Sequence, residues 1–396
     1  MARLPSAESE LLFERVCASG ARPASRAHAQ AVDWLAVAQL AERENLLGVL
    51  WPALASEQDV IPGEVAGLMR KQALVSEFRM VALEANLGRV VRLFNDHDIP
   101  VMLMKGAALA ATRYGSFARR PMGDLDLLVR DGQVRQAWGL LRGAGWLPER
   151  DGMDAFYDEH QHLCPLIGPG GGHMVVELHR CLLYPHGPFL LAEADVWAAA
   201  SRVDIHGRPA WVPSPEHLAL HFCIHFAWSH QMRFGLGRTV RDLGVLSPVI
   251  DWDRLAEMAR ASRAESCCYW TLRLAATLGG VPVPSEVLAS LAPRSPRWLG
   301  AALQRIVTAE ALDLRQEFTP SLRLGRFAWS LAIRPRASGH GGSRPWQHRE
   351  DFGKFAHGLP PLSFARRVRA QLGALPRWAR FVAVAAGAST PPRARQ

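Results

Sequence analysis

The fold of this chain is decided by residues 99–129, which read IPVMLMKGAALAATRYGSFARRPMGDLDLLV. Ile99–Met104 is a short apolar run, which is typical of a buried strand, and Asp124–Val129 predicts a second strand. Lys105-Gly106 ends the first strand, and the residues that follow, up to Gly115, predict a short helix. The pattern is therefore a strand, a glycine turn, a helix and a strand.

The flanking sequence extends this pattern. Asp131 is expected to cap a helix that ends at Gly143–Gly145. Further strands are predicted at His162–Ile167 and Met174–His179, joined by the glycine-rich residues 168–172. Apolar residues three and four positions apart predict helices on both sides of this region. The expected class is α+β, with a small mixed sheet between helical regions.

Four regions follow from these patterns: an N-terminal helical region (1–98), a core with the sheet (99–212), a helical domain (213–312) and a basic C-terminal segment (313–396). The net charge of +9 belongs to the last region, because residues 319–396 hold 14 Lys and Arg against two acids. Such a segment can contact RNA phosphates or an acidic partner. A solvated basic face or a mobile tail is the alternative.

Asp124 and Asp126 are the strongest chemical signal. Side chains alternate along a strand, so both carboxylates are expected on one face. They would repel one another unless a cation neutralised them, and Mg²⁺ takes oxygen ligands of this kind. An edge strand with two exposed acids is the alternative, and the D-x-D pattern alone does not exclude it.

Two further features favour a phosphoryl-transfer site. At Lys105-Gly106 a buried strand ends and a helix begins, which directs backbone N–H groups toward an anion. A third acid, Glu177, lies in a strand-like run whose apolar neighbours point the other way, and Glu193 and Asp195 are the poorer alternatives. In such sites metal ions stabilise the attacking and leaving oxygens of an in-line displacement.

These motifs, MLMKGAALAATRYGSFARRPMGDLDLLV followed by VVELHR, resemble the uncharacterised bacterial nucleotidyltransferases of the DNA-polymerase-β-like superfamily. The resemblance covers about residues 30 to 290 and makes 99–212 the nucleotidyltransferase core. It implies that Asp124 and Asp126 are metal ligands, with Glu177 as the third acid. It also implies that Gly106 is the glycine of the phosphate turn.

Two positions depart from the family's pattern. Ala107 stands where superfamily members often have a serine that contacts a phosphate, and Arg180 stands where relatives often have an aromatic residue. Lys105 is predicted to supply charge at the turn instead. Arg119 and Arg120 precede the acidic strand and are candidates to reach a triphosphate or an acceptor, although solvation explains two surface arginines equally well.

His217, His221 and His225 recur every fourth residue and therefore share one helix face. A zinc site would need a further ligand at recognisable spacing. A helix that lines the catalytic cleft fits them better, and packed core histidines are the simplest explanation. Arg241-Asp242 is interpreted either as a structural ion pair or as a pocket contact.

The resemblance implies a Mg²⁺-dependent enzyme that transfers a nucleotidyl group from an NTP to an acceptor hydroxyl. The acceptor is left open between an RNA end, a small molecule such as an aminoglycoside or sugar, and a protein side chain. The alternative is a non-catalytic nucleotide-binding or regulatory partner protein on the same fold. The intact set of acids argues against that alternative.

The composition argues against a membrane-spanning protein and against a framework of disulfide bonds. The chain has no apolar stretch near the roughly 20 residues that a bilayer crossing needs, so no membrane span is expected. The six cysteines form no CxxC pair and no regular spacing, which favours buried free thiols in a reducing compartment. The expected location is the cytoplasm.

Overall fold

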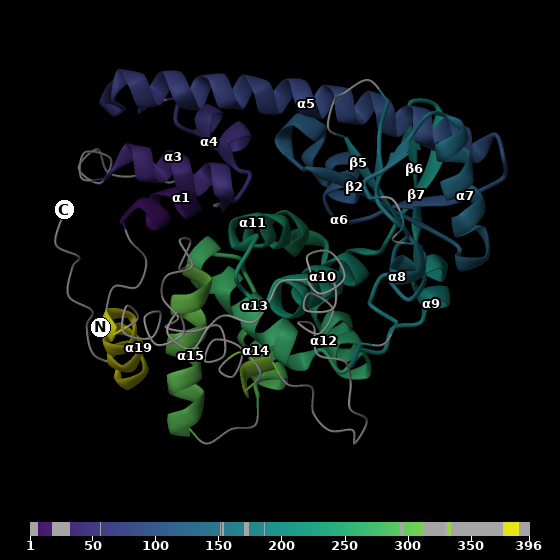
Figure 1. Ribbon diagram of the computed structural model, residues 1–396. Coiled ribbons are helices and arrows are strands. Elements are labelled where there is room, and N and C mark those ends of the chain that lie inside the picture. Colours follow the sequence, from purple (N-terminus) through teal and green to yellow (C-terminus); the bar gives the residue numbers. More distant parts are fainter. Residues whose placement is uncertain are drawn as a thin grey trace, which may run out of the picture.

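The computed structural model describes residues 7–17, 32–55, 57–150, 152, 154–169, 174–185, 187–293, 297–312, 329, 331–333 and 375–387. The long helix α5 (Gly63–Asn95) runs along one side of the molecule (Figure 1). Its first half covers small N-terminal helices and its second half covers the sheet, while α10 to α15 lie on the opposite side. The sheet therefore lies between helices from both parts of the chain.

The sheet is mixed and has seven strands in the order β3-β4-β5-β2-β1-β7-β6. The central strand β2 runs antiparallel to β1 and parallel to β5, so the two acidic strands of the sequence are neighbours. The strand bounds are β1 (Val101–Leu103), β2 (Asp124–Val129), β3 (Leu147–Pro148), β4 (Leu166–Ile167), β5 (Val175–His179), β6 (Ser201–Ile205) and β7 (Arg208–Val212).

The described helices surround this sheet, and three short 3₁₀ turns and two π-helical turns connect them. The α-helices are α1 (Ala7–Cys17), α3 (Trp34–Arg43), α4 (Leu47–Ala53), α5, α6 (Lys105–Leu109), α7 (Asp131–Gly143), α8 (Asp154–Asp158), α9 (Glu193–Ala198), α10 (Pro215–Ile224), α11 (Leu236–Leu246), α12 (Trp252–Ala261), α13 (Glu265–Gly279), α14 (Ser285–Leu291), α15 (Arg297–Leu312) and α19 (Leu375–Ala386). The short turns are η1 (Gln58–Val60), η2 (Ala110–Tyr114), η3 (Phe117–Arg119), η4 (His225–Ser229) and η5 (Ser247–Val249).

The predicted strand–turn–helix–strand pattern of residues 99–129 is confirmed. After β1 the chain enters α6, continues through the π-helical turn η2 and leaves at Gly115, whose φ of 68° is a conformation that glycine adopts at little cost. The strand predicted at Asp124–Val129 has those bounds. The α+β class is confirmed with it.

The two faces of the sheet have different environments. Leu125, Leu127 and Val176 belong to the main hydrophobic core, which α5 and α7 complete on their side. The opposite face carries Asp124 and Asp126, because side chains alternate along β2. On that face a smaller core packs Leu128 against α9, and the rest of the face lies opposite α10 and α11.

Several local predictions differ from the structure. The strand expected at His162–Ile167 is reduced to β4, because Pro165 has no N–H group for the ladder and pairing resumes only after it. Asp131 is the first residue of α7 and not its cap; the cap position is Arg130, which makes no side-chain capping bond. The β6–β7 hairpin was not predicted; His206 and Gly207, both with positive φ, form its turn.

Other expectations concern the rest of the chain. Five of the six cysteines are buried free thiols, and Cys181 is half-buried. Among the described helices none combines the length and apolarity needed to cross a membrane. Most of the basic segment 313–396 lies outside the described residues.

Candidate active site

The acidic residues meet at the centre of the sheet. Asp126 on β2 and Glu177 on β5 are direct partners in the parallel register, and Asp124 lies two residues before Asp126 on the same face. The predicted third acid therefore lies on the strand next to the D-x-D strand and on the same face. Its catalytic role stays a prediction.

The surroundings of Asp124 raise the pKa of its carboxyl. Burial raises its pKa, and the neighbouring Asp126 charge raises it further, to about 6. The charges of Lys105 and Arg238 oppose this effect. A carboxyl with such a pKa marks a place where negative charge accumulates without full compensation. That is the condition under which a bound cation becomes favourable.

Lys105 supplies the nearest positive charge. Its Nζ donates to Asp126 Oδ1 at 2.7 Å, and the side chain is largely buried. Its backbone has φ 45°, in the left-handed region that residues other than glycine rarely adopt. Strain of this kind persists where the surrounding structure holds it, often at functional sites. The turn after β1 thus directs an ammonium group toward the carboxylates.

His179 completes the cluster, and the sequence reasoning did not single it out. It is fully buried at the end of β5, and its Nε2 lies 3.0 Å from Asp126 Oδ1 and 3.5 Å from Glu177 Oε2. Its second ring nitrogen, Nδ1, is buried without a hydrogen-bond partner among the described residues. The signal was available, because Glu177 and His179 are two positions apart and therefore share a face.

These contacts explain the protonation states. Burial disfavours the charged carboxylate, yet the Lys105 ammonium and the His179 hydrogen bond hold the pKa of Asp126 well below its usual range. For Glu177 burial again acts upward, but His179 and His162 lower the pKa. In turn, Asp126 and Glu177 raise the pKa of His179 despite its burial. The cluster is a coupled set of charges that depend on one another.

The donor atoms suit a metal ion. Asp126, Glu177 and His179 each offer one ligand atom, and these atoms all lie within 4.8 Å of one another. The expected metal ligands were Asp124, Asp126 and Glu177. The structure brings the last two together with a histidine, and Asp124 lies at the edge of this group.

Gly106 and Arg120 have a different setting from the expected phosphate contacts. A Cβ on Gly106 would lie 3.3 Å from Arg120 Cζ, so the glycine lets the guanidinium pack against the turn. Arg120 forms two bonds of 2.7 Å with Asp242 and one of 2.7 Å with the Pro121 carbonyl. Tyr114 also donates to Asp242, at 2.8 Å. Three nitrogens of Arg120 are thus engaged, and a role in nucleotide binding stays a prediction.

Comparison with known proteins identifies the family. Residues 30–280 match the model of a family described as an uncharacterised nucleotidyltransferase. The chain belongs to this family. The predicted resemblance, which covered about residues 30 to 290, is confirmed, and so is the broad class of nucleotidyltransferase enzyme.

Other comparisons add little. No curated protein matches the chain. Among solved structures, the solution structure of the antibiotic-resistance factor ANT(2'')-Ia is similar at 15% sequence identity. That match covers 54% of this chain and 90% of the other, with a TM-score of 0.28.

Of the three histidines that share a helix face, His217 and His221 lie on α10 and His225 begins η4. His221 is buried, and burial together with the Lys105 charge lowers its pKa to about 3. His221 and His225 line a small cavity with Tyr184 and Trp228. His217 instead contacts the Ser214 hydroxyl at 2.9 Å, at the start of the helix. The helix therefore presents neutral imidazoles toward the catalytic face, and the structure supports packed core histidines.

Arg238 is a further residue that sequence reasoning missed. It lies in the first turn of α11, and its Nε is buried without a hydrogen-bond partner among the described residues. Burial lowers its pKa, and its charge acts on Asp124. Because α11 is far from β2 in sequence, nothing in the local pattern indicated this approach. Among the described residues no carboxylate forms an ion pair with Arg238, although the charges of Glu44 and Asp124 act on it.

Proposed function

We propose that this nucleotidyltransferase carries out Mg²⁺-dependent transfer of a nucleotidyl group from an NTP to an acceptor hydroxyl. One observation carries the proposal: Asp126 and Glu177 are register partners on adjacent parallel strands, with Asp124 on the same face. Buried carboxylates this close are stable only with cations between them. Lys105, His179 and Arg238 supply part of that positive charge, and a bound cation would supply the rest.

The donor set fits the ion. Mg²⁺ prefers a few carboxylate oxygens and keeps water and phosphate oxygens as its other ligands. Asp124, Asp126 and Glu177 would hold it, and His179 would fix the orientation of the Asp126 and Glu177 carboxylates. When bound, the ion supplies charge that stabilises the attacking and leaving oxygens.

The reaction itself is a displacement at the α-phosphorus. The acceptor oxygen forms a bond to that phosphorus as the bond to the bridging oxygen breaks, and pyrophosphate leaves. The hydroxyl proton passes to a carboxylate or to water. Lys105 and Arg238 are the cations suited to stabilise the triphosphate, because such catalysis consists mostly of positioning and charge stabilisation.

The identity of the acceptor is a separate question from the transfer reaction. The candidates from the sequence are an RNA end, a small molecule and a protein side chain. The arginines of the basic segment, such as Arg323 and Arg366, lie outside the described residues. A non-catalytic nucleotide-binding protein is the second candidate. The complete acid set with its charge-coupled lysine favours the enzyme.

The test is transfer of label from NTP. The protein is incubated with each α-labelled NTP, Mg²⁺ and a cell extract, and the labelled product is assigned to RNA, protein or small molecules. Asp126→Asn is expected to abolish labelling without unfolding the chain. Asp131→Asn, at an exposed acid in the first turn of α7, is the control and should label like wild type. Equal labelling by the Asp126→Asn variant would refute the mechanism.

A further inference from the structure

A second histidine lies beside the candidate active site. His162 forms an antiparallel bridge with His179, the last residue of β5, and flanking backbone bonds of 2.9 and 3.0 Å continue the pairing. Residues directly opposite each other in such a pair have their side chains on the same face of the sheet. The two rings accordingly lie together, with their centroids 5.1 Å apart, on the face that carries Asp126 and Glu177.

The hydrogen bonding of His162 decides which of its ring nitrogens can bind a cation. Nδ1 lies 2.8 Å from the carbonyl oxygen of Leu163, which can only accept, so Nδ1 carries the proton that is donated. In the neutral ring Nε2 then has a free lone pair. The side chain is buried, with 8% exposed, and Nε2 forms no hydrogen bond with any residue that the structure describes. His162 therefore has a buried donor atom available for a ligand.

The surroundings of this nitrogen indicate a metal ion as the ligand. Nε2 lies 3.9 Å from Glu177 Oε2, which is too long for a hydrogen bond, so no shared proton offsets the repulsion between the lone pair and the carboxylate. An ion between the two atoms would make both of them ligands. Donor atoms that bind one ion at roughly 2.1 Å lie roughly 3–3.5 Å apart, so a small side-chain adjustment is enough. Metal-bound histidines also commonly donate their other N–H to a backbone carbonyl, as His162 does to Leu163.

The complete donor set is of a kind that Mg²⁺ does not prefer. Asp126, Glu177 and His179 each offer an atom within 4.8 Å of the others, and His162 approaches this group from the side of Glu177. Two imidazole nitrogens with two carboxylates suit a transition-metal ion, whereas Mg²⁺ takes oxygen ligands. His179 Nε2 would exchange its contact with Asp126 for the ion and lose its proton, because a ligand imidazole is neutral. Through the ion it would still hold both carboxylates in place.

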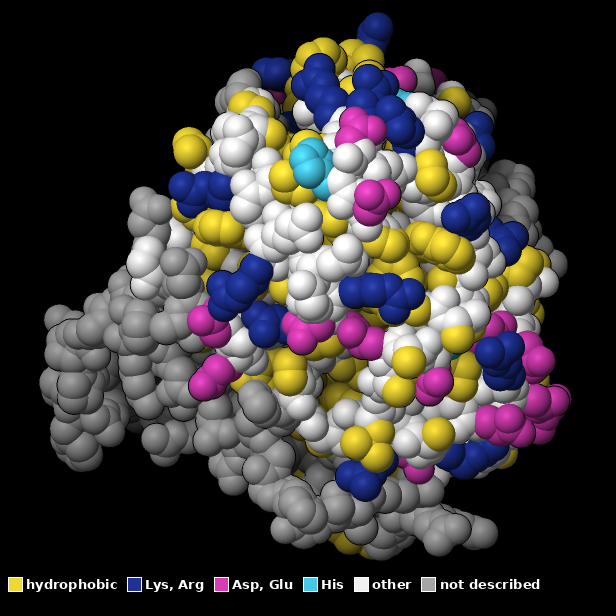
Figure 2. All heavy atoms as spheres, turned by 90° about the vertical axis from the view of Figure 1, so that its right-hand side faces the viewer, with side chains coloured by type: hydrophobic (Ala, Val, Ile, Leu, Met, Phe, Trp, Pro, Cys, Tyr) yellow, Lys and Arg dark blue, Asp and Glu magenta, His cyan; other side chains and the backbone are white. Residues whose placement is uncertain are grey.

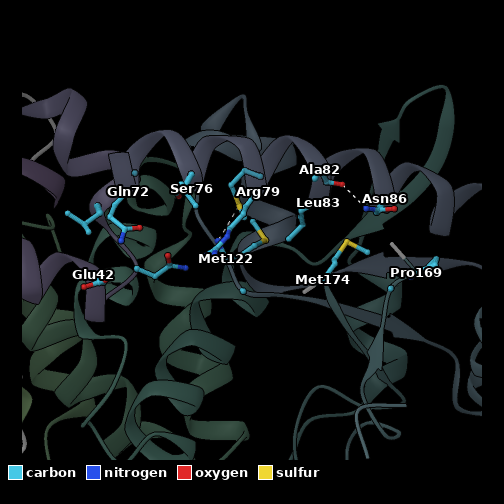
Figure 3. A pocket seen from close by; sticks show the side chains of 17 residues that line it. Glu42, Gln72, Ser76, Arg79, Ala82, Leu83, Asn86, Met122, Pro169 and Met174 are labelled. Atoms are coloured by element: carbon cyan, nitrogen blue, oxygen red, sulfur yellow. Dashed lines mark hydrogen bonds between the residues drawn. The ribbon is translucent and has the colours of Figure 1, made fainter. Parts of the chain in front are cut away.

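The cavity beneath α5 offers no comparable donor set. Figure 3 shows that α5 forms its roof, across the sheet from the carboxylates, and among the described residues that line it Glu42 is the one acid and none is a histidine. Figure 2 shows one face of the molecule, on which acidic and basic side chains are interspersed and histidine contributes little of the surface. A metal ion that prefers imidazole therefore meets few competing histidines on that face.

We propose that His162, His179, Asp126 and Glu177 bind a divalent transition-metal ion, in addition to the Mg²⁺ of the proposed transfer reaction. The inference goes beyond the proposed function and rests on it only for the Mg²⁺ that shares Asp126 and Glu177. Two ions that share carboxylates in this way typically lie about 3.5–4 Å apart. His162 binds through Nε2, and the Leu163 carbonyl holds its ring in the tautomer that this requires.

Electron paramagnetic resonance of the full chain with Mn²⁺ alone tests for imidazole ligands without any substitution. Spin-echo modulation detects nitrogen nuclei that are coupled to the bound ion, and protein labelled with ¹⁵N-histidine identifies them as imidazole nitrogens. We expect nitrogen modulation in the wild-type protein and a change to the ¹⁵N pattern after labelling. Bound Mn²⁺ without nitrogen modulation has only oxygen ligands, which overturns the inference and leaves the proposed Mg²⁺-dependent transfer intact.

His162→Asn tests the fourth ligand, because asparagine keeps an N–H group near the position of Nδ1 and removes Nε2. Calorimetric titration measures the binding of Zn²⁺ and of Mg²⁺ separately. We expect Zn²⁺ to bind wild type more tightly than Mg²⁺ does, and to bind His162→Asn at least about 10-fold more weakly, while Mg²⁺ binding is unchanged. His206→Asn, at a half-exposed histidine of the β6–β7 turn, is the control and should bind both ions like wild type.

Three results of the titrations overturn the inference. They are equal Zn²⁺ binding by wild type and His162→Asn, equal losses of Zn²⁺ and Mg²⁺ binding in that variant, and a wild type that binds Zn²⁺ no more tightly than Mg²⁺. Equal losses would show that His162 only supports the local structure, since a structural role does not distinguish one ion from the other. These titrations contain no nucleotide, so the transfer of label from NTP tests the proposed function independently.

Discussion

At the scale of the residue, the site depends on what surrounds Asp126. One of its oxygens, Oδ1, accepts from Lys105 at 2.7 Å and lies 3.0 Å from His179 Nε2. Alternation along a strand was enough to predict that Asp124 and Asp126 share a face. The same rule would have found His179, two positions after Glu177. The partner of Arg120 was beyond sequence reasoning, because Asp242 lies on a helix 122 residues away.

His221 gives a prediction for how the stability of the fold depends on pH. Burial and the Lys105 charge lower its folded-state pKa to about 3, while Asp126 acts in the opposite direction and His179 adds to the decrease. In the unfolded chain an imidazole titrates near 6.5, at about its ordinary value. The unfolded state therefore binds a proton first as the pH falls, and stability is lost progressively below pH ~6.5.

Between pH 6.5 and pH 4.5, the low pKa of His221 should lower the free energy of unfolding by about 2 kcal/mol. His221→Asn removes the titrating group, so its free energy of unfolding should fall less steeply over that range. His206→Asn, at a half-exposed histidine of the β6–β7 turn, controls for the substitution itself. Chemical denaturation at a series of pH values measures both. Parallel pH profiles for wild type and His221→Asn would show that His221 is not held neutral.

At the scale of the element, the ion pair between Arg120 and Asp242 joins the loop before β2 to α11. Arg120, just after η3, contacts Asp242 in the middle of α11 through two bonds of 2.7 Å, and Tyr114 adds a third bond from η2. Asp242 is almost fully buried. The sequence left Arg241-Asp242 open between a structural ion pair and a pocket contact, and it could not say which element Asp242 would meet.

Asp242→Asn is expected to destabilise the fold by about 3 kcal/mol, because it leaves the Arg120 charge buried without its partner. The control is Asp158→Asn, which breaks the ion pair between Arg135 and Asp158 on the surface. Both partners of that pair are largely exposed, so its loss should cost less than about 1 kcal/mol. Urea denaturation compares the two variants. Equal losses in the free energy of unfolding would mean that the buried pair stabilises the contact between α11 and the loop before β2 no more than a surface pair would.

At the scale of the whole molecule, elements that are far apart in the sequence pack against one another. Residues of α1, the sheet and α13 share one hydrophobic core. Glu44, just after α3, accepts the N–H of Gly237 at 2.9 Å, and Arg241 donates to the Val16 carbonyl at 3.0 Å. A carboxylate at the N-terminus of α11 is also favoured by the helix dipole. Periodicity predicts which face of a helix is buried, and contacts between such distant residues cannot be read from it.

The central claim is that the acids of β2 and β5 form a metal-dependent nucleotide site. Calorimetric titration of each NTP into the protein, with Mg²⁺ and then with EDTA, tests it most directly. We predict tight binding of at least one NTP with Mg²⁺, and binding at least about 10-fold weaker in EDTA or in Asp126→Asn, because losing even a group that only supports a metal ligand costs about that much. Asp131→Asn should bind like wild type. Binding that is equally tight with and without Mg²⁺, or unchanged in Asp126→Asn, would contradict the account.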